Sequence, residues 1–467
     1  MVPHPPGSGT SECWGSADVL GEARTRELAA DALRRSVGGQ AEVVLLSWEG
    51  ALTRFANNTI HQNVAERGAQ VLVRVAVGRR VGAAVTNRLD REGVERAVDQ
   101  AEAAARVAPG TAEFPGFPEP RPAPRVGSLD DRVAGASPAW RARQVQAFLR
   151  EVEAEGASAA GALETGVQEV AVVNSQGVFC YHAGTRWHFR TVVHVDGASG
   201  YAERTGWRLD HFDAATVGHP AVDGAKRARH PRPVQPGTYS VVLAPYAVQD
   251  VVSWLAYAGA GAQAMQEGRS WMNGRLGLRA LSEQVTLWDD GCDPQGIPMP
   301  FDFEGVPRQR VVIVERGVPR TPVYDTLTAA REGKASTGHA LPRAWPETTR
   351  VGPVPAHLFL AAGDATVEEL VRGVSHGLYI TRFWYTRLVH PRDCVVTGMT
   401  RDGVFWIEGG ELTYPVRNLR FTQGYVQALG SVLRVGAETS LLGDRFGAVR
   451  VPALSVAQFT FTGVTEF

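Results

Sequence analysis

Two proline-rich segments interrupt the chain and limit how much of it can form one continuous folded unit. Six prolines fall within residues 108–125, and three more fall within residues 230–236. Prolines at this density keep the backbone extended and interrupt both helices and central strands. We predict an N-terminal domain over 18–229 that contains the first segment as a semi-rigid connector, and a C-terminal domain over 230–467. Residues 1–17, rich in Pro, Gly and Ser, are predicted to be a flexible tail without a secretory signal.

The same order of elements is predicted twice before residue 230. Apolar residues at helical spacing predict helices over 18–37, 90–107, 137–155 and 214–229. Between them lie β-branched runs at 41–47, 52–56, 70–76 and 81–86, and then at 169–174, 177–182 and 187–196. Helix, strands and helix therefore recur on both sides of the connector, which predicts an α/β domain of two related halves.

Strands dominate the pattern beyond residue 230. A strand over 239–243 and an apolar helix over 247–265 come first, and strands and turns follow from residue 275. Glycines predict two hairpins, one turning at Gly317 and one at Gly409-Gly410. The whole chain is therefore predicted to be α+β, with a β-rich C-terminal domain.

Composition excludes several classes of protein. Hydrophobic residues make up 44% of the chain and charged residues 21%, which excludes a disordered or collagen-like chain. The net charge of −1 provides no broad basic surface for nucleic acid, and no apolar run approaches the ~18 residues of a membrane span. The four cysteines (Cys13, Cys180, Cys292 and Cys394) form no C-x-x-C pair, which fits a reducing compartment. We expect a cytoplasmic protein with neither nucleic acid nor membrane as a partner.

Common catalytic motifs are absent or out of context. There is no His-Glu dipeptide of the kind found in zinc peptidases. Residues 373–377 match G-x-S-x-G, but a predicted helix precedes them and a predicted strand follows, the reverse of a nucleophile elbow. His182, His188 and His194 recur every six residues, which places neighbours about 20 Å apart along a strand, too far to share one metal ion. We interpret them as half-exposed strand histidines.

Five segments, in order along the chain, carry a resemblance to a known family. They are Thr53–Asn58, the strands and helix over 71–108, Asp302–Gly317, Ala335–Ala340 and Gly403–Val416. Together they resemble the TldD/PmbA family, and the last two resemble its PmbA branch, also called TldE. The sequence departs from the PmbA pattern at 382–388 and at 181–194, so its partner and substrates can differ from the usual ones.

The resemblance implies a fold, an activity and a partner. Family members combine an α/β N-terminal part with a β-rich C-terminal part and pair into dimers that enclose a chamber. TldD carries zinc on an H-E-x-x-x-H helix, with a further cysteine ligand near the C-terminus. TldE lacks this site and serves as the partner. The pair removes leader peptides from precursors and degrades small unfolded proteins.

Aligned with that zinc helix, this chain has Ser253 and Trp254 at the first His-Glu and Ala258 at the second His. None of the three can ligate zinc or act as a general base in these positions. The last cysteine, Cys394, lies upstream of the TldD ligand. The resemblance therefore implies a subunit without a metal or cofactor of its own, inactive alone, whose zinc is held by a TldD-like partner.

The S-T-G-H turn is our candidate for the wall of the peptide chamber, with Ser336, Thr337, Gly338 and His339 as substrate-binding residues. Its alternative is a structural turn in which Gly338 supplies an unusual backbone angle. Two other functions stay open. One is a homodimeric peptide-binding protein without peptidase activity. The other is an enzyme that uses the histidines of 182–194, should these converge with His211 or His339.

Overall fold

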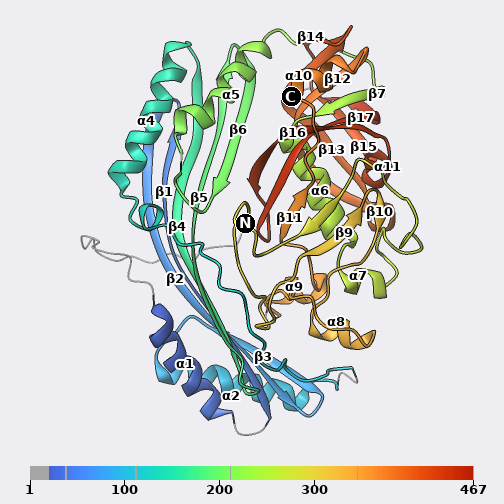
Figure 1. The fold of residues 1–467 in the computed structure, drawn as a ribbon. Coiled ribbons are helices and arrows are strands. Elements are labelled where there is room, and N and C mark those ends of the chain that lie inside the picture. Colours follow the sequence, from blue (N-terminus) through green and yellow to red (C-terminus); the bar gives the residue numbers. More distant parts are fainter. Residues whose placement is uncertain (1–19, 37–38, 111–112, 211, 344, 466–467) are drawn as a thin grey trace.

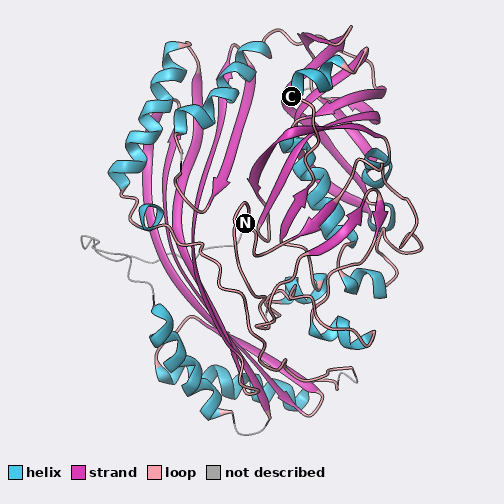
Figure 2. Ribbon diagram, viewed as in Figure 1, coloured by secondary structure: helices cyan, strands magenta, loops and turns pink. Residues whose placement is uncertain are grey.

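The computed structural model describes residues 20–36, 39–110, 113–210, 212–343 and 345–465. The predicted tail, Cys13 and His211 lie outside the described residues. Two sheets organise the described chain: six strands from residues 40–206 form one, and eleven strands from residues 237–464 form the other. Figures 1 and 2 show the first as a long curved layer beside the second. The predicted α+β fold is confirmed.

The first sheet is antiparallel, in the order β3-β2-β1-β4-β5-β6. Its strands are β1 (Gln40–Ala56), β2 (Thr59–Val77), β3 (Arg80–Thr86), β4 (Ser158–Asn174), β5 (Phe179–Val195) and β6 (Ala198–Gly206). The helices are α1 (Gly21–Arg35), α2 (Arg91–Val107), the short α3 (Asp131–Ala134), α4 (Pro138–Ala154) and α5 (Ala214–Arg227). Three strands flanked by long helices therefore occur twice, as the sequence predicts. Pairing of β1 with β4 joins both halves in one sheet.

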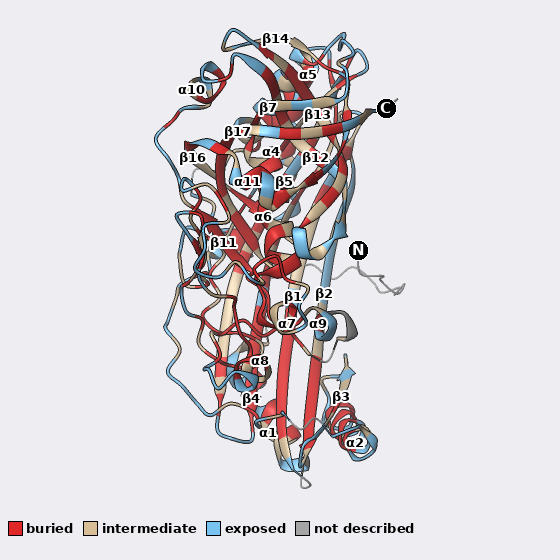
Figure 3. Ribbon diagram, turned by 90° about the vertical axis from the view of Figure 1, so that its right-hand side faces the viewer, coloured by how far each residue is buried: buried red, intermediate tan, exposed pale blue. Residues whose placement is uncertain are grey.

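The two faces of this sheet have different neighbours. Helices α1 and α2 pack on one face against side chains such as Val43, and α4 and α5 pack on the same face against Phe55. On the opposite face Val44 and Leu46 pack with Phe301 of the C-terminal domain. Because both faces are covered here, residues 41–47 are apolar at almost every position instead of alternating. Figure 3 shows this part of β1 and β2 as buried.

Several strands are longer than predicted. The runs at 41–47 and 52–56 are parts of β1, and those at 177–182 and 187–196 are parts of β5. Between the first two, Trp48-Glu49-Gly50 breaks the apolar pattern because this stretch of β1 is partly exposed. The backbone ladder with β2 continues through it without a break, so the change of pattern marks a change of environment.

The motif Thr53–Asn58 builds the turn between β1 and β2. Asn57 and Asn58 have φ values of 49° and 58°, the left-handed geometry of a tight hairpin. The Asn58 side chain accepts a hydrogen bond from the Ala159 N–H (2.7 Å) and donates one to the Ala157 carbonyl (2.8 Å). This asparagine therefore fixes the hairpin tip against the start of β4.

A buried ion cluster joins the first sheet to the C-terminal domain through the motif Asp302–Pro307. Arg74 of β2 contacts Glu42 of β1 at 2.6 Å and Glu304 of the motif at 3.3 Å. Asp302 accepts hydrogen bonds from the backbone N–H groups of Glu304 (2.9 Å) and Ala340 (2.8 Å) and so shapes the loop. Gly305, at φ +74°, lets this loop approach the turn between β4 and β5: a Cβ there would lie 2.5 Å from a methyl of Val178. We call Glu42, Arg74 and Glu304 the buried ion cluster.

The second sheet contains a closed ring of strands, because β7 pairs with both β12 and β17 along the path β7-β12-β13-β15-β17. The strands are β7 (Gly237–Leu243), β8 (Leu287–Asp289), β9 (Val311–Glu315), β10 (Val318–Pro319), β11 (His357–Leu360), β12 (His376–His390), β13 (Val395–Glu408), β14 (Glu411–Pro415), β15 (Leu419–Gly424), β16 (Val432–Gly443) and β17 (Ala448–Val464). The helices are α6 (Pro245–Gly259), α7 (Ala262–Gln266), α8 (Thr326–Arg331), α9 (Pro346–Val351), α10 (Val367–Arg372) and α11 (Tyr425–Gly430). The main core surrounds α6.

Local predictions for this half are confirmed at several points. The two glycine turns connect β9 with β10 and β13 with β14, with positive φ at Gly317, Gly409 and Gly410. The G-x-S-x-G match lies between α10 and β12, the helix-then-strand order that the sequence indicated. None of the described helices has the length and apolar character needed to cross a membrane. Whether the two parts fold independently, as the division at residue 230 predicts, stays a prediction.

Candidate functional site

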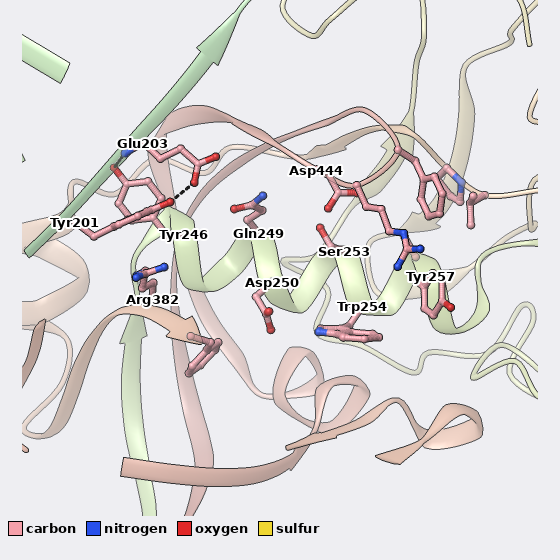
Figure 4. Close-up of a pocket in the computed structure, with 16 residues that line it drawn as sticks. Tyr201, Glu203, Tyr246, Gln249, Asp250, Ser253, Trp254, Tyr257, Arg382 and Asp444 are labelled. Atoms are coloured by element: carbon pink, nitrogen blue, oxygen red, sulfur yellow. Dashed lines mark hydrogen bonds between the residues drawn. The ribbon is translucent and has the colours of Figure 1, made fainter. Parts of the chain in front are cut away.

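A pocket of about 330 Å³ opens where β6 meets the C-terminal domain, and Figure 4 shows its lining. Its floor is α6, which begins with Pro245 at its first position, where the missing N–H costs nothing. One stripe of α6 (Val248, Val251, Val252 and Leu255) is buried in the core. The other stripe lines the pocket with Tyr246, Gln249, Asp250, Ser253, Trp254 and Tyr257. We call this cavity the α6 pocket.

Three other segments complete the walls. Tyr201 and Glu203 come from β6, Arg382 and Phe383 from β12, and Asp444, Arg445 and Phe446 from the loop between β16 and β17, with Val354 and Pro355 at the rim. The Ser253 hydroxyl points toward the Asp444 carboxyl. Burial raises the pKa of Asp444, and the Ser253 hydroxyl opposes part of that rise.

A hydrogen-bond network holds the pocket floor in place. The Trp254 indole N–H donates to the Thr386 hydroxyl (2.9 Å), which in turn donates to Asp250 (2.7 Å). The Tyr425 hydroxyl donates to the other Asp250 oxygen (2.6 Å). Burial nevertheless raises the pKa of Asp250 to about 6, because the bonds to Tyr425 and Thr386 offset only part of the desolvation. Trp254 is therefore held in a fixed orientation.

The wall from the first sheet is also fixed by charge pairs. Glu203 contacts His188 of β5 (2.9 Å) and accepts a hydrogen bond from the Tyr201 hydroxyl (2.5 Å). Burial disfavours the imidazolium, but hydrogen bonds to Glu164 and Glu203 outweigh it and raise the pKa of His188. The Arg382 guanidinium lies 3.9 Å above the Tyr201 ring and is paired with Asp402.

The residues that the family resemblance predicts at the zinc-helix positions do not fit a metal. Ser253 offers a neutral hydroxyl, the Trp254 indole nitrogen is a donor only, and Ala258 is 1% exposed in the core. Cys394 is fully buried in the same core, and burial raises the pKa of its thiol. Within the described ranges, no three His, Cys, Asp or Glu side chains gather closely enough to hold a metal ion.

The histidines of β5 lie in separate environments. His182 contacts the Ser128 hydroxyl (2.7 Å) and the Pro298 carbonyl oxygen (3.0 Å), His188 pairs with Glu203, and His194 is exposed. The only contacts found for the His339 ring are with Thr337 and Asp289, so among described residues it does not converge with them. His182 and His188 are half-buried and His194 is exposed, close to the half-exposed strand histidines that the sequence predicts.

The predicted Ser336–His339 turn is buried and lies away from the α6 pocket. Ser336 and Thr337 hydroxyls donate to the Tyr324 carbonyl (both 3.1 Å), and His339, fully buried, contacts Asp289 (2.9 Å). Gly338 has φ +77° and passes so close to Pro307 that a Cβ would lie 2.4 Å from its carbonyl oxygen. These contacts are typical of a structural turn, and its role in substrate binding stays a prediction.

Two segments in which the sequence departs from the PmbA pattern meet at the α6 pocket. The 181–194 segment is β5, whose His188 supports Glu203, and the 382–388 segment is β12, which supplies Arg382 and Thr386. The acids Glu203, Asp250 and Asp444 were missed by the sequence analysis. The polar stripe on the otherwise apolar α6 was one available signal for Asp250, whereas the other walls come from distant segments.

Family models match three parts of the chain: domain 1 of the PmbA/TldA metallopeptidases at 41–105, their central domain at 134–229 and their C-terminal domain at 236–463. The chain belongs to the PmbA/TldD metallopeptidase family. The resemblance to the TldD/PmbA family seen in the sequence is thereby confirmed.

Individual relatives belong to the same family, but each alignment covers only part of this chain and part of the relative. Over 172 residues the chain is 33% identical to an uncharacterized protein of Methanocaldococcus jannaschii, covering 36% of this chain and 40% of that protein. It is 25% identical to the metalloprotease PmbA of Escherichia coli O157:H7 over 187 residues, 39% of this chain and 38% of that protein. Each match therefore spans less than half of the relative.

The crystal structure of TldE from Thermococcus kodakarensis is similar over nearly the whole chain. It superimposes with a TM-score of 0.83 at 18% identity and covers 94% of this chain and all of that chain. At this identity the likeness establishes the shared fold alone.

Proposed function

We propose that this PmbA/TldD-family chain is the non-catalytic, TldE-like subunit of a zinc metallopeptidase that cleaves unstructured peptides. The zinc is held by a TldD-like partner, and this chain forms one wall of a peptide chamber. The observation that carries the proposal is the set of side chains on α6. At the positions where TldD is expected to hold its metal, this chain has the Ser253 hydroxyl, the Trp254 indole, which can only donate, and the buried Ala258 methyl.

The network around α6 supports the same conclusion. The Trp254 indole donates to Thr386, and the Asp250 carboxyl in turn fixes Thr386, so the indole cannot swing aside without breaking its hydrogen bond. The pocket retains volume and polar groups although its zinc chemistry is gone. A chamber wall that binds peptide without cleaving it needs both the open volume and the polar groups.

The first experiment is elemental analysis of the untagged chain purified alone. We expect substantially less than one zinc per chain. Near-stoichiometric zinc that is lost in a His188→Ala variant would overturn the non-catalytic assignment and indicate chemistry on the β5 histidines.

The second experiment reconstitutes the assembly with an H-E-x-x-x-H protein encoded by the same genome. We expect cleavage of an unstructured peptide only when both chains are present, and none of a folded protein of similar size. Light scattering of each chain and of the mixture measures assembly. Stable self-association that the second chain leaves unchanged would favour instead the homodimeric peptide-binding protein without peptidase activity.

A further inference from the structure

We propose that the α6 pocket binds the cationic side chain of a basic residue in an extended peptide. The inference rests on the proposed function in one respect, that the ligand is a peptide. It adds the class of side chain that the pocket selects.

The pocket carries more negative than positive charge. The carboxyls of Asp250 and Asp444 lie on either side of α6 (Figure 4). The positive charge of Arg382 is paired with Asp402, and Glu203 is paired with His188. Behind the wall, the buried Arg186 guanidinium of β5 is shared among Glu164, Glu203 and Asp444. Glu164 and Glu203 also contact His188, so Asp250 and Asp444 are the lining carboxyls that form no direct ion pair with another described residue. Arg445 is the lining guanidinium outside the Arg382–Asp402 pair, and an entering cation is attracted to the two carboxyls.

Aromatic rings form the rest of the pocket. Tyr246, Trp254 and Tyr257 line it from α6, and Phe446 lines it from the loop. The faces of such rings attract ammonium and guanidinium groups, with the largest contribution from Trp. Trp254 is held by Thr386, and the Tyr246 ring packs edge-on against Tyr201 at 5.2 Å. Because these rings are fixed before a ligand arrives, little side-chain entropy is lost on binding.

The protonation of the carboxyls gives the binding a measurable signature. The pKa values of Asp250 and Asp444 are raised, first by burial, and Asp444 adds to the rise at Asp250. A bound cation favours the ionised forms, so binding near pH 6 releases protons and the affinity falls as pH drops from 7 to 5. Other titratable or charged groups face these carboxyls or line the same pocket: Glu203, His188, Tyr201, Tyr246, Tyr425, Cys394, Arg186, Arg382 and Arg445.

The test uses two blocked hexapeptides that differ at one residue, arginine in one and its neutral isostere citrulline in the other. Titration calorimetry on the intact chain alone measures both affinities. We expect the arginine peptide to bind about tenfold more tightly. Asp444→Asn, whose fold is checked by circular dichroism, should weaken the arginine peptide about tenfold and leave the citrulline peptide unchanged. The matched control is Asp364→Asn, a loop carboxyl that is 85% exposed and outside the pocket lining, and it should change neither affinity.

Equal affinity for the two peptides, or an unchanged arginine affinity in Asp444→Asn, would overturn the proposal. Absence of binding by both peptides at about 1 mM would overturn it as well. Tight binding of arginine amide with no gain from the peptide would overturn the assignment to a peptide. These results leave the proposed function to be decided separately, because zinc content and reconstituted cleavage do not depend on which side chain the pocket selects.

Discussion

The buried ion cluster and the α6 pocket both lie where the first sheet meets the C-terminal domain, and they differ in almost every physical respect. In the cluster, the side chains of Glu42, Arg74 and Glu304 are 1–8% exposed, and Arg74 lies within 3.3 Å of both carboxylates. In the pocket, Asp250 and Asp444 remain partly exposed beside a cavity of about 330 Å³. The same types of residue therefore join the two parts at one contact and leave space for a ligand at the other.

The difference in exposure and in direct ion pairing distinguishes charges that stabilise this fold from charges that can bind a ligand. In the cluster, both carboxylates contact the Arg74 guanidinium inside the protein, so loss of these contacts should appear as lost stability. In the pocket, Asp250 and Asp444 lie beside a cavity and form no direct ion pair with another described residue, so their loss should appear as lost binding. Substitutions in the two regions test this comparison through the unfolding free energy and the affinity for peptide.

The largest effect is expected for Arg74→Met, which removes the guanidinium that contacts both Glu42 and Glu304, while Arg343 stays 3.9 Å from Glu304. Two carboxylates are then buried without their partner, and the unfolding free energy should fall by about 3–5 kcal/mol. Urea denaturation followed by circular dichroism measures it. The control is Arg67→Met, whose exposed pair with Glu49 should be worth less than about 1 kcal/mol. Equal losses in both variants would remove the distinction between the cluster and the surface.

A pH-dependent effect is expected at Glu42, whose pKa is raised to about 7 by burial although Arg74 opposes the rise. The folded protein then holds a proton that the unfolded chain releases near its ordinary value of 4.5. The stability of the natural protein should therefore fall, relative to Glu42→Gln, as pH rises from 4.5 to 7. The difference should reach on the order of 2 kcal/mol, measured by urea midpoints at several pH values. A difference that is constant with pH would show that Glu42 stays ionised throughout.

The next effect concerns the turn beside the cluster, through Gly338→Ala. The alanine would have to adopt the left-handed backbone conformation of Gly338 (φ +77°), and its Cβ would lie 2.4 Å from the Pro307 carbonyl oxygen. We expect a loss of about 2 kcal/mol, seen as a lower melting temperature. Gly333→Ala is the matched control, because Gly333 also has positive φ (+62°) but has open space around it. A selective loss of peptide binding without destabilisation would instead support the turn as a substrate contact.

The smallest effect on stability is expected for Asp444→Asn at the pocket. Asp444 shares Arg186 with Glu164 and Glu203, so its neutral isostere leaves that guanidinium with two carboxylates and should change the unfolding free energy by less than about 0.5 kcal/mol. Thermal unfolding without ligand measures this. A large destabilisation would mean that Asp444 belongs to the structural charges, and the contrast between the two regions would disappear.

Much of the fold could be predicted from local signals in the sequence. Ser137 caps α4 ahead of Pro138, and the Asp90 side chain caps α2, each at the boundary that the sequence indicates. The extent of β1 and β5 was not predicted, because both cross from a buried to a partly exposed environment and their apolar pattern changes there. A strand continues wherever its backbone partners continue, and those partners cannot be read from one segment.

The candidate site was less predictable than the fold. Ser253 and Trp254 were identified through the family resemblance and do line the pocket, whereas Ala258 faces the core. Glu203 and Asp444 lie more than 200 residues apart and meet only because β6 packs near the β16–β17 loop. Nothing in the spacing of such residues connects them. The departures from the family pattern at β5 and β12 were the more useful signal, since both segments support this pocket.

The pairing of β1 with β4 has a consequence for the protein while it is being made. About a hundred residues separate the end of β1 from the start of β4, so at ordinary translation rates one side of β1 waits roughly 5–20 s for its neighbour. During that interval the apolar stretch around Val43 and Leu46 presents an unpaired strand edge on the ribosome, and this edge can pair with a strand of another nascent chain. Chaperone capture of translating ribosomes should therefore peak before Ser158 emerges and decline once β4 has been synthesised.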